Sequence, residues 1–267
     1  DVAEVEALDA VMLQGAYGSK LARDRRRVQR IGDVLRQYGI DLGTASIGGV
    51  DAMAASITGS RLRDYLVVAL FQLSSGAGQI GDRQLQRRCR ELIAAACTPE
   101  RAAFYLQEGS ASAEDKRTVL RALEPQVASG IEATLVAMAM DNVGLGELAD
   151  TMLARLDVAS PSSYELHLGR FARAWSRARV GVDTTDPGPL RDAATAARFE
   201  ALAQAALAAN PQRRGGWINV LRVLCAAGSS RAVAVGNRAL ELFPDDPTLL
   251  YYTASALQCS DKPAARR

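Results

Sequence analysis

The segment from Gly76 to Gly81, Gly-Ala-Gly-Gln-Ile-Gly, has the glycine spacing of a dinucleotide-binding loop. In such a loop the glycines let the backbone approach a pyrophosphate at the N-terminus of a helix. The site also requires a strand–helix–strand unit and an acidic residue about 20 residues further on. Here the chain continues with Cys97-Thr98-Pro99 and another helical pattern, which begins with the acid at that distance, Glu100. A dinucleotide-binding enzyme is therefore a remote alternative.

Other residues that could support catalysis or bind a metal are sparse. The chain has one histidine, His167, and four cysteines that form no Cys-x-x-Cys pair: Cys89, Cys97, Cys225 and Cys259. A zinc site of ordinary spacing cannot be built from this set. The sequence also lacks a histidine partner for a nucleophile and a Gly-x-x-x-x-Gly-Lys-Ser/Thr loop. We therefore expect no catalytic residues, no cofactor and no metal. Free thiols suit a reducing compartment.

Basic residues are almost all arginine, because only three of the 32 Lys and Arg residues are lysines. A GC-rich coding sequence explains this bias, and so does selection for phosphate binding by guanidinium groups. The formal charge of the chain is only +2. Two helical patterns nevertheless carry clusters of arginines, which are interpreted either as solvated helix faces or as an RNA contact. The candidate RNA-binding residues are Arg23, Arg26, Arg27, Arg30, Arg173 and Arg177.

Composition predicts the elements that would position these side chains. Hydrophobic residues make up 48% of the chain but aromatic residues only 5%, and the apolar content is mainly Ala, Leu and Val. Ala and Leu favour helices, and strand-forming clusters are rare, so we expect an all-α protein. No apolar run has the ~20 residues of a membrane span. The chain starts at Asp1, which is compatible with a removed targeting peptide or with a trimmed sequence.

Apolar periodicity divides the chain into successive pairs of helices. We expect an N-terminal helical hairpin over residues 1–42, with helices near 5–13 and 19–38. A Gly-, Ser- and Ala-rich linker is expected over 43–60. A helical repeat domain over 61–256 follows, and residues 257–267 form a polar tail. Within the first pair of that domain we expect a turn at residues 74–81. Ser112 and Asp115 predict a capped helix start, and Pro125 predicts either a kink in that helix or its end.

The pairs recur at a nearly constant spacing. Helix-opening positions are separated by 37, 31, 31, 54 and 32 residues, and the long interval includes the loop Gly-Val-Asp-Thr-Thr-Asp-Pro-Gly-Pro-Leu. These positions are Leu62, Pro99, Gly130, Pro161, Gly215 and Pro247. A period in the low thirties predicts a right-handed α-solenoid of about five helix-turn-helix repeats.

The segment 207–256 resembles a tetratricopeptide or pentatricopeptide repeat. The first-helix pattern is matched by Trp217, Val220, Leu224 and Gly228, and the second helix and its end by Ala232, Ala239 and Pro244. The match departs at Gly236, where a large residue is usual in the family. Upstream pairs resemble the degenerate helical repeats of organellar RNA-binding proteins. Both families imply binding surfaces without chemistry of their own.

The leading hypothesis is therefore a non-catalytic scaffold or adaptor subunit of a larger protein complex. The Arg-rich, Lys-poor repeats suit an organellar assembly, so we expect a mitochondrial location, with the cytoplasm as the alternative. RNA binding in an organelle is the second hypothesis. We expect the final helix to need a partner protein, which would bind at Leu249, Leu250, Tyr251 and Tyr252.

Overall fold

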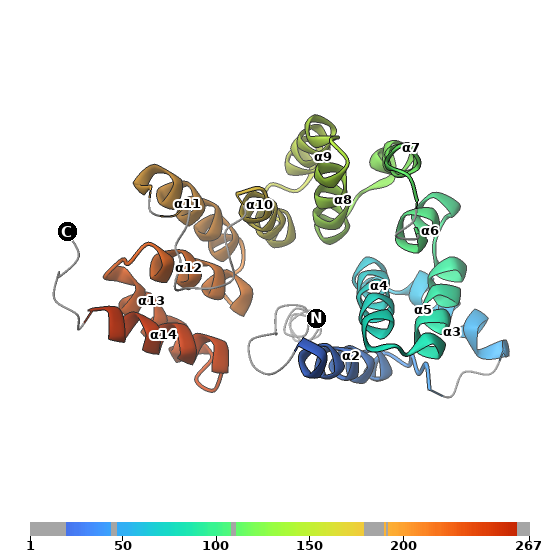
Figure 1. The fold of residues 1–267 in the computed structure, drawn as a ribbon, viewed down its shortest axis with the longest axis horizontal. Coiled ribbons are helices and arrows are strands. Elements are labelled where there is room, and N and C mark those ends of the chain that lie inside the picture. Colours follow the sequence, from blue (N-terminus) through green and yellow to red (C-terminus); the bar gives the residue numbers. More distant parts are fainter. Residues whose placement is uncertain (1–19, 44–46, 108–110, 179–189, 191, 261–267) are drawn as a thin grey trace. The chain divides into compact units, whose positions relative to one another are not determined.

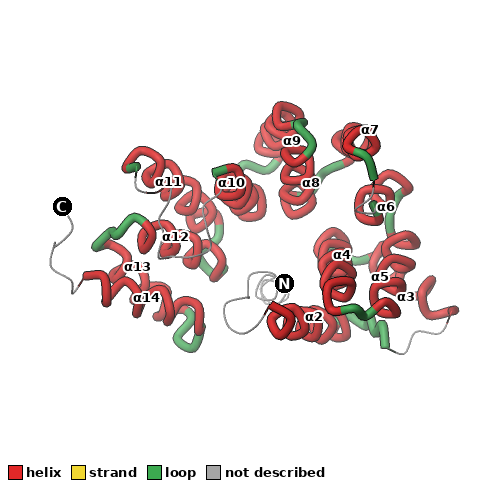
Figure 2. Tube along the Cα trace, viewed as in Figure 1, coloured by secondary structure: helices red, strands yellow, loops and turns green. Residues whose placement is uncertain are grey.

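A computed structural model describes residues 20–43, 47–107, 111–178, 190 and 192–260. Throughout these residues the chain forms thirteen α-helices, joined by loops and one short 3-10 turn, with no strand (Figures 1 and 2). The prediction of an all-α protein is confirmed. The expected helix at 5–13, most of the loop at 181–190 and the end of the polar tail lie outside the described residues.

The chain divides into two compact units, residues 1–152 and 153–267. Helix α9 (Gly146–Ala159) crosses this division. The sequence had instead predicted a boundary in the Gly-, Ser- and Ala-rich segment 43–60. In the structure this segment contains helix α3 (Ile47–Gly59), which packs against α4 (Arg63–Ile80) and α5 (Arg83–Ala96).

Helix α3 corrects the linker prediction for a clear physical reason. Its residues Ala54 and Ile57 are 5% and 0% exposed, so they belong to the core of the first unit. Burial of one apolar stripe can stabilise a helix whose Gly and Ser residues have low helix propensity. The composition of residues 47–59 therefore resembles that of a linker although the segment is a packed helix.

The first unit is arranged around α4. Helix α2 (Lys20–Gln37), α5 and α8 (Gly130–Asn142) all pack against it. Helix α6 (Pro99–Leu106) packs against α5 and against α7 (Ala113–Leu123). The buried core residues of α2 and α4 include Ile31, Leu35, Leu70 and Leu73.

Helix α4 continues through the segment predicted to be a turn, so that prediction is wrong. Its α-helical conformation ends at Ile80, and Gly81 follows with a φ of 82°, the left-handed conformation that favours glycine at a helix end. The backbone N–H of Asp82 donates to the carbonyl of Ala77 at 2.9 Å. The carboxylate of Asp82 then accepts from Leu85 N at 2.9 Å and caps the start of α5.

The glycines of this segment allow close packing between helices. A Cβ added at Gly76 would lie 2.7 Å from Cγ2 of Val28 on α2. A Cβ added at Gly78 would lie 2.7 Å from the side-chain amide of Gln86 on α5. Since Gly76 and Gly78 lie inside a helix, they do not form the loop before a helix that a dinucleotide site requires.

Local sequence signals for helix ends are confirmed in α7 and after it. Ser112 and Asp115 form a reciprocal capping box, in which Ser112 Oγ accepts from the backbone of Asp115 at 3.1 Å. The helix ends at Leu123, and the following residues Glu124–Gln126, which include Pro125, form the 3-10 turn.

The second unit is arranged around α12 (Arg214–Ala226). Helices α11 (Ala193–Ala209), α13 (Arg231–Leu242) and α14 (Pro247–Ser260) all pack against α12, and α13 and α14 pack against each other. Helix α10 (Tyr164–Arg177) packs against α11. The aromatic core between α10 and α11 consists of Phe171, Trp175 and Phe199.

Candidate functional site

Helix α14 is fixed at its start by Asp246. One oxygen of this carboxylate accepts from the backbone N–H groups of Thr248 at 2.9 Å and Leu249 at 3.0 Å, which caps the helix. The other oxygen forms an ion pair with Arg214 of α12 at 2.5 Å. The Pro-Asp-Asp-Pro sequence therefore ends one helix, starts the next and attaches that next helix to α12.

The body of α14 is held by Tyr252, which is 6% exposed. Its hydroxyl accepts from Nε of Arg222 at 3.3 Å, and its carbonyl accepts from the thiol of Cys225 at 3.5 Å. Helix α13 approaches closely at Gly236, where an added Cβ would lie 2.3 Å from Oγ1 of Thr253. This contact leaves no room for a larger side chain at position 236.

The four residues predicted to bind a partner lie on two different faces of α14. Leu249 is 0% exposed and Tyr252 is buried, so both contribute to the core of the second unit and cannot form the expected surface. Leu250 and Tyr251 are 46% and 40% exposed. The physical reason is helical geometry, because consecutive residues point about 100° apart and four in a row cannot share one face.

Four large apolar side chains of this region are exposed, and we refer to them together as the C-terminal apolar surface. It consists of Leu242 of α13 and Leu250, Tyr251 and Leu257 of α14, which are 40–47% exposed. Among the described residues only one other large hydrophobic side chain, Val158, is exposed. Leu250 and Leu257 are seven residues apart and lie on one stripe of the helix. Sequence reasoning missed Leu242 and Leu257, although the i, i+7 spacing of Leu250 and Leu257 was a usable signal.

The arginines predicted to bind RNA are dispersed over the two units, with different roles. On α2, Arg26 and Arg30 are exposed, whereas Arg27 donates to the side-chain carbonyl of Gln72 on α4 at 2.7 Å. The side chain of Arg23 lies outside the described residues. In the second unit Arg173 is only 5% exposed and cannot contact RNA, while Arg177 is exposed. Arg173 lies seven residues after Leu166 and four after Gly169, so it falls on the buried stripe of α10.

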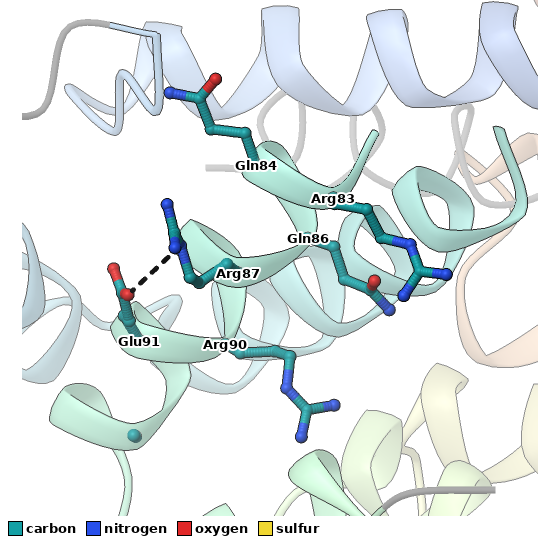
Figure 3. Close-up of a pocket in the computed structure, with 7 residues that line it drawn as sticks. Arg83, Gln84, Gln86, Arg87, Arg90 and Glu91 are labelled. Carbon is teal, nitrogen blue, oxygen red and sulfur yellow. Dashed lines mark ion pairs between the residues drawn. The ribbon is translucent and has the colours of Figure 1, made fainter. Parts of the chain in front are cut away.

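A second basic helix face, on α5, was missed by the sequence analysis. Its side chains line an open hollow along the helix (Figure 3). Arg87 points toward Glu91, 3.9 Å away, in an exposed pair. Arg90 donates to the carbonyl of Leu106 at 2.9 Å. The signal was present in the i, i+4, i+7 spacing of three arginines. The lining residues are Arg83, Gln84, Gln86, Arg87, Arg90, Glu91 and Ala94.

Buried titratable groups gather between α4, α6 and α8. Glu132 is 2% exposed and its carboxylate lies 3.0 Å from the guanidinium of Arg101 and 3.4 Å from the hydroxyl of Tyr105. Asp64 of α4 lies 3.7 Å from Arg101. Burial raises the pKa of Glu132, although Arg101 opposes the shift. Burial also raises the pKa of Tyr105. These contacts join three helices, which gives the cluster a clear structural role.

The described residues contain no group of three or more His, Cys, Asp or Glu side chains that could hold a metal ion. No helix in this part of the chain is long and apolar enough to cross a membrane. Comparison with known proteins found no matching family, no matching curated protein and no matching solved structure.

Proposed function

We propose that the chain is a non-catalytic helical-repeat scaffold, an adaptor subunit that binds another protein of a larger assembly. The observation that carries this proposal is the C-terminal apolar surface. Leu242, Leu250, Tyr251 and Leu257 remain 40–47% exposed although α14 is bonded to α12 through Tyr252 and Asp246 and α13 packs against both helices. Three of the four lie on one helix, α14, and exposed apolar side chains concentrated on a helix are typical of protein interaction sites.

The packing of α12, α13 and α14 supports the repeat architecture in the proposal. Each of these helices contacts the other two, and α11 packs against α12 in the same unit. A helix pair that buries one face on its neighbour leaves its other face for the next pair, which is the principle of a solenoid. Helix α14 has buried one face on α12 and α13, and its Leu250–Leu257 stripe points elsewhere.

The occupant that fits this surface is an apolar helix or loop of a different protein. Burying the exposed remainder of four large apolar side chains would contribute about 1 kcal/mol each. A contribution of this size is enough for one contact between two proteins that also touch elsewhere in the assembly. The proposed assembly is organellar, in the mitochondrion, which the arginine-rich and lysine-poor composition supports.

The test compares native co-purification of three full-length chains carrying the same affinity tag. The wild type is expected to recover a stoichiometric partner protein. The variant Leu250→Glu/Leu257→Glu is expected to lose it, because two carboxylates cannot be buried against an apolar partner. The matched control is Ala234→Glu/Asn237→Glu, which places the same charge at two exposed positions of α13. It is expected to retain the partner.

Two results would contradict the proposal. One is equal recovery of the same partner by wild type, variant and control. The other is that purified wild type forms a dimer which Leu250→Glu/Leu257→Glu converts to monomers in analytical ultracentrifugation. That outcome would assign the C-terminal apolar surface to self-association, not to an adaptor function.

A further inference from the structure

Positive charge is concentrated on two helices of the first unit. Helix α2 contains seven basic and two acidic residues, a net charge of +5, and α5 contains four basic and one acidic residue, a net charge of +3. The whole chain has a formal net charge of only +2, so the remainder is acidic overall. Such segregation produces a local positive potential that the net charge conceals.

Some of these arginines bind other groups within the first unit. Arg27 bonds to Gln72, and Arg36 pairs with Asp33 on its own helix. Arg88 donates to the backbone carbonyls of Leu42 and Gly43, and Arg90 to that of Leu106. These guanidinium groups hold loops and helix ends in place, so they are poorly available to a ligand.

Four other arginines are available on the surface, two on each helix. Arg25, Arg30 and Arg83 are exposed and make no hydrogen bond or ion pair among the described residues. Arg87 is 73% exposed and has only the 3.9 Å contact with Glu91. We call Arg25, Arg30, Arg83 and Arg87 the arginine surface.

The two helices border a common hollow. It is lined by Gln29 and Gly32 of α2 and by Gln84, Leu85 and Arg88 of α5, together with residues 40–43. Gln84 lines both this hollow and the one along α5, so the two hollows adjoin. Arg83 and Arg87 line the hollow along α5, and Arg25 and Arg30 line neither hollow. Their walls include glutamine amides, which can donate to phosphate oxygens, and also the carboxylates of Asp41, Asp82 and Glu91.

The chemistry of the surface identifies the kind of partner. Guanidinium groups bind phosphates bidentately, and protein partners usually require apolar anchors. Among the described residues, neither α2 nor α5 has an exposed large hydrophobic side chain. Such a surface lacks the anchors for a protein partner and the apolar wedge for a membrane. We propose that the arginine surface binds the phosphate backbone of a single nucleic-acid strand, independently of base sequence.

The proposal is tested by fluorescence anisotropy with the full chain and a labelled 20-nucleotide single-stranded RNA of mixed sequence. Four phosphate contacts predict an affinity about 50-fold weaker at 200 mM than at 50 mM NaCl, since each contact releases about 0.7 counterion. The variant Arg25→Gln/Arg30→Gln/Arg83→Gln/Arg87→Gln is expected to lose most of the affinity at 50 mM and most of its salt dependence. Circular dichroism would establish that it is folded.

The matched control is Arg121→Gln/Arg198→Gln/Arg231→Gln/Arg238→Gln, which removes the same charge from exposed positions elsewhere. It is expected to bind within about twofold of wild type, apart from the small effect of net charge. DNA of the same sequence should bind equally, because phosphate contacts do not read the 2′-hydroxyl. Equal losses in the two quadruple variants, or the absence of salt-sensitive binding by wild type, would overturn the proposal. Displacement of the RNA by polyglutamate or phosphatidylserine vesicles at equal charge would overturn it in favour of an acidic protein or a membrane.

Discussion

The guanidinium of Arg101 lies 3.0 Å from a carboxylate oxygen of Glu132, and the two side chains are 12% and 2% exposed. Arg101 belongs to α6 and Glu132 to α8, and the same guanidinium donates to the carbonyl of Gln126 at 3.0 Å. A buried ion pair gains little over an apolar pair, but loss of one partner leaves an uncompensated charge. The pair therefore links α6 to α8 within the first unit.

The variant Glu132→Ala should destabilise the first unit by about 3–5 kcal/mol, because Arg101 would remain buried with less compensation. Glu132→Gln should cost less, since the amide oxygen can still accept from Arg101 and Tyr105. Urea unfolding followed by far-UV circular dichroism measures this loss. A loss below about 1 kcal/mol for Glu132→Ala would contradict the assigned role.

Tryptophan fluorescence supplies an internal control for that experiment. The chain contains two tryptophans, Trp175 and Trp217, and both belong to the second unit. We expect the circular dichroism curve of Glu132→Ala to shift to lower urea while the fluorescence transition stays in place. The double variant Arg101→Met/Glu132→Leu should recover much of the lost stability, because it removes both charges together.

The free energy of unfolding should depend on pH because the pKa of Glu132 is raised in the folded chain. Burial raises the pKa of Glu132 above its ordinary value of 4.5, so the folded chain binds this proton more tightly than the unfolded chain. The resulting contribution to stability is complete below pH 4.5 and is lost as the pH rises through the raised pKa. Relative to Glu132→Gln, the wild type should therefore gain stability as the pH falls from 7 to 4.5 in urea titrations. A difference that is constant over this range would contradict the raised pKa.

The two cysteines of the first unit, the buried Cys89 and the partly buried Cys97, should both react slowly with thiol reagents. Burial raises the pKa of Cys89 to about 12 and that of Cys97 to about 11. At pH 8 a thiol with a pKa near 11 is about 0.1% thiolate, which is the reactive form. Both residues should react slowly with iodoacetamide in the native chain and rapidly in 8 M urea, as measured by peptide mass spectrometry. Rapid native labelling of Cys89 would contradict its burial.

The sequence predicted the helical class and several helix ends well, because these depend on local chemistry. The capping box at Ser112 and the proline after Leu123 act on neighbouring backbone groups. The extent of α4 could not be predicted in this way. Its segment 74–80 has the composition of a turn, but Gly76 is required where α2 approaches through Val28. That requirement comes from a residue 48 positions away, which no local pattern contains.

The candidate surfaces were predictable only in part for a similar reason. The helix at Leu249–Tyr252 was correctly expected, but which of its residues are buried depends on how α14 is rotated against α12. Likewise the sequence shows that α2 is rich in arginine. The hydrogen bond from Arg27 to Gln72, however, depends on how α2 packs against α4. Periodicity identifies faces of a helix, and only the packing decides which face remains in solvent.

The contact between Gly236 and Thr253 gives a prediction that separates packing from helix propensity. Alanine is about 1 kcal/mol better than glycine inside a helix, so propensity alone would make Gly236→Ala stabilising. The added Cβ would, however, lie 2.3 Å from Oγ1 of Thr253, which is buried and donates to the carbonyl of Leu249 at 2.8 Å. We therefore expect Gly236→Ala to destabilise the second unit by about 1–3 kcal/mol, measured by tryptophan fluorescence in urea.

Two further variants locate the cause of that loss. Gly236→Ala/Thr253→Ala removes the clashing hydroxyl and methyl groups, so it should be more stable than Gly236→Ala alone. Gly32 of α2 is the matched control, because a Cβ added there meets nothing within 4 Å. Gly32→Ala should stabilise the first unit by up to about 1 kcal/mol, measured by circular dichroism. If Gly236→Ala stabilised the second unit as Gly32→Ala stabilises the first, α13 and α14 would not pack as closely as the structure shows.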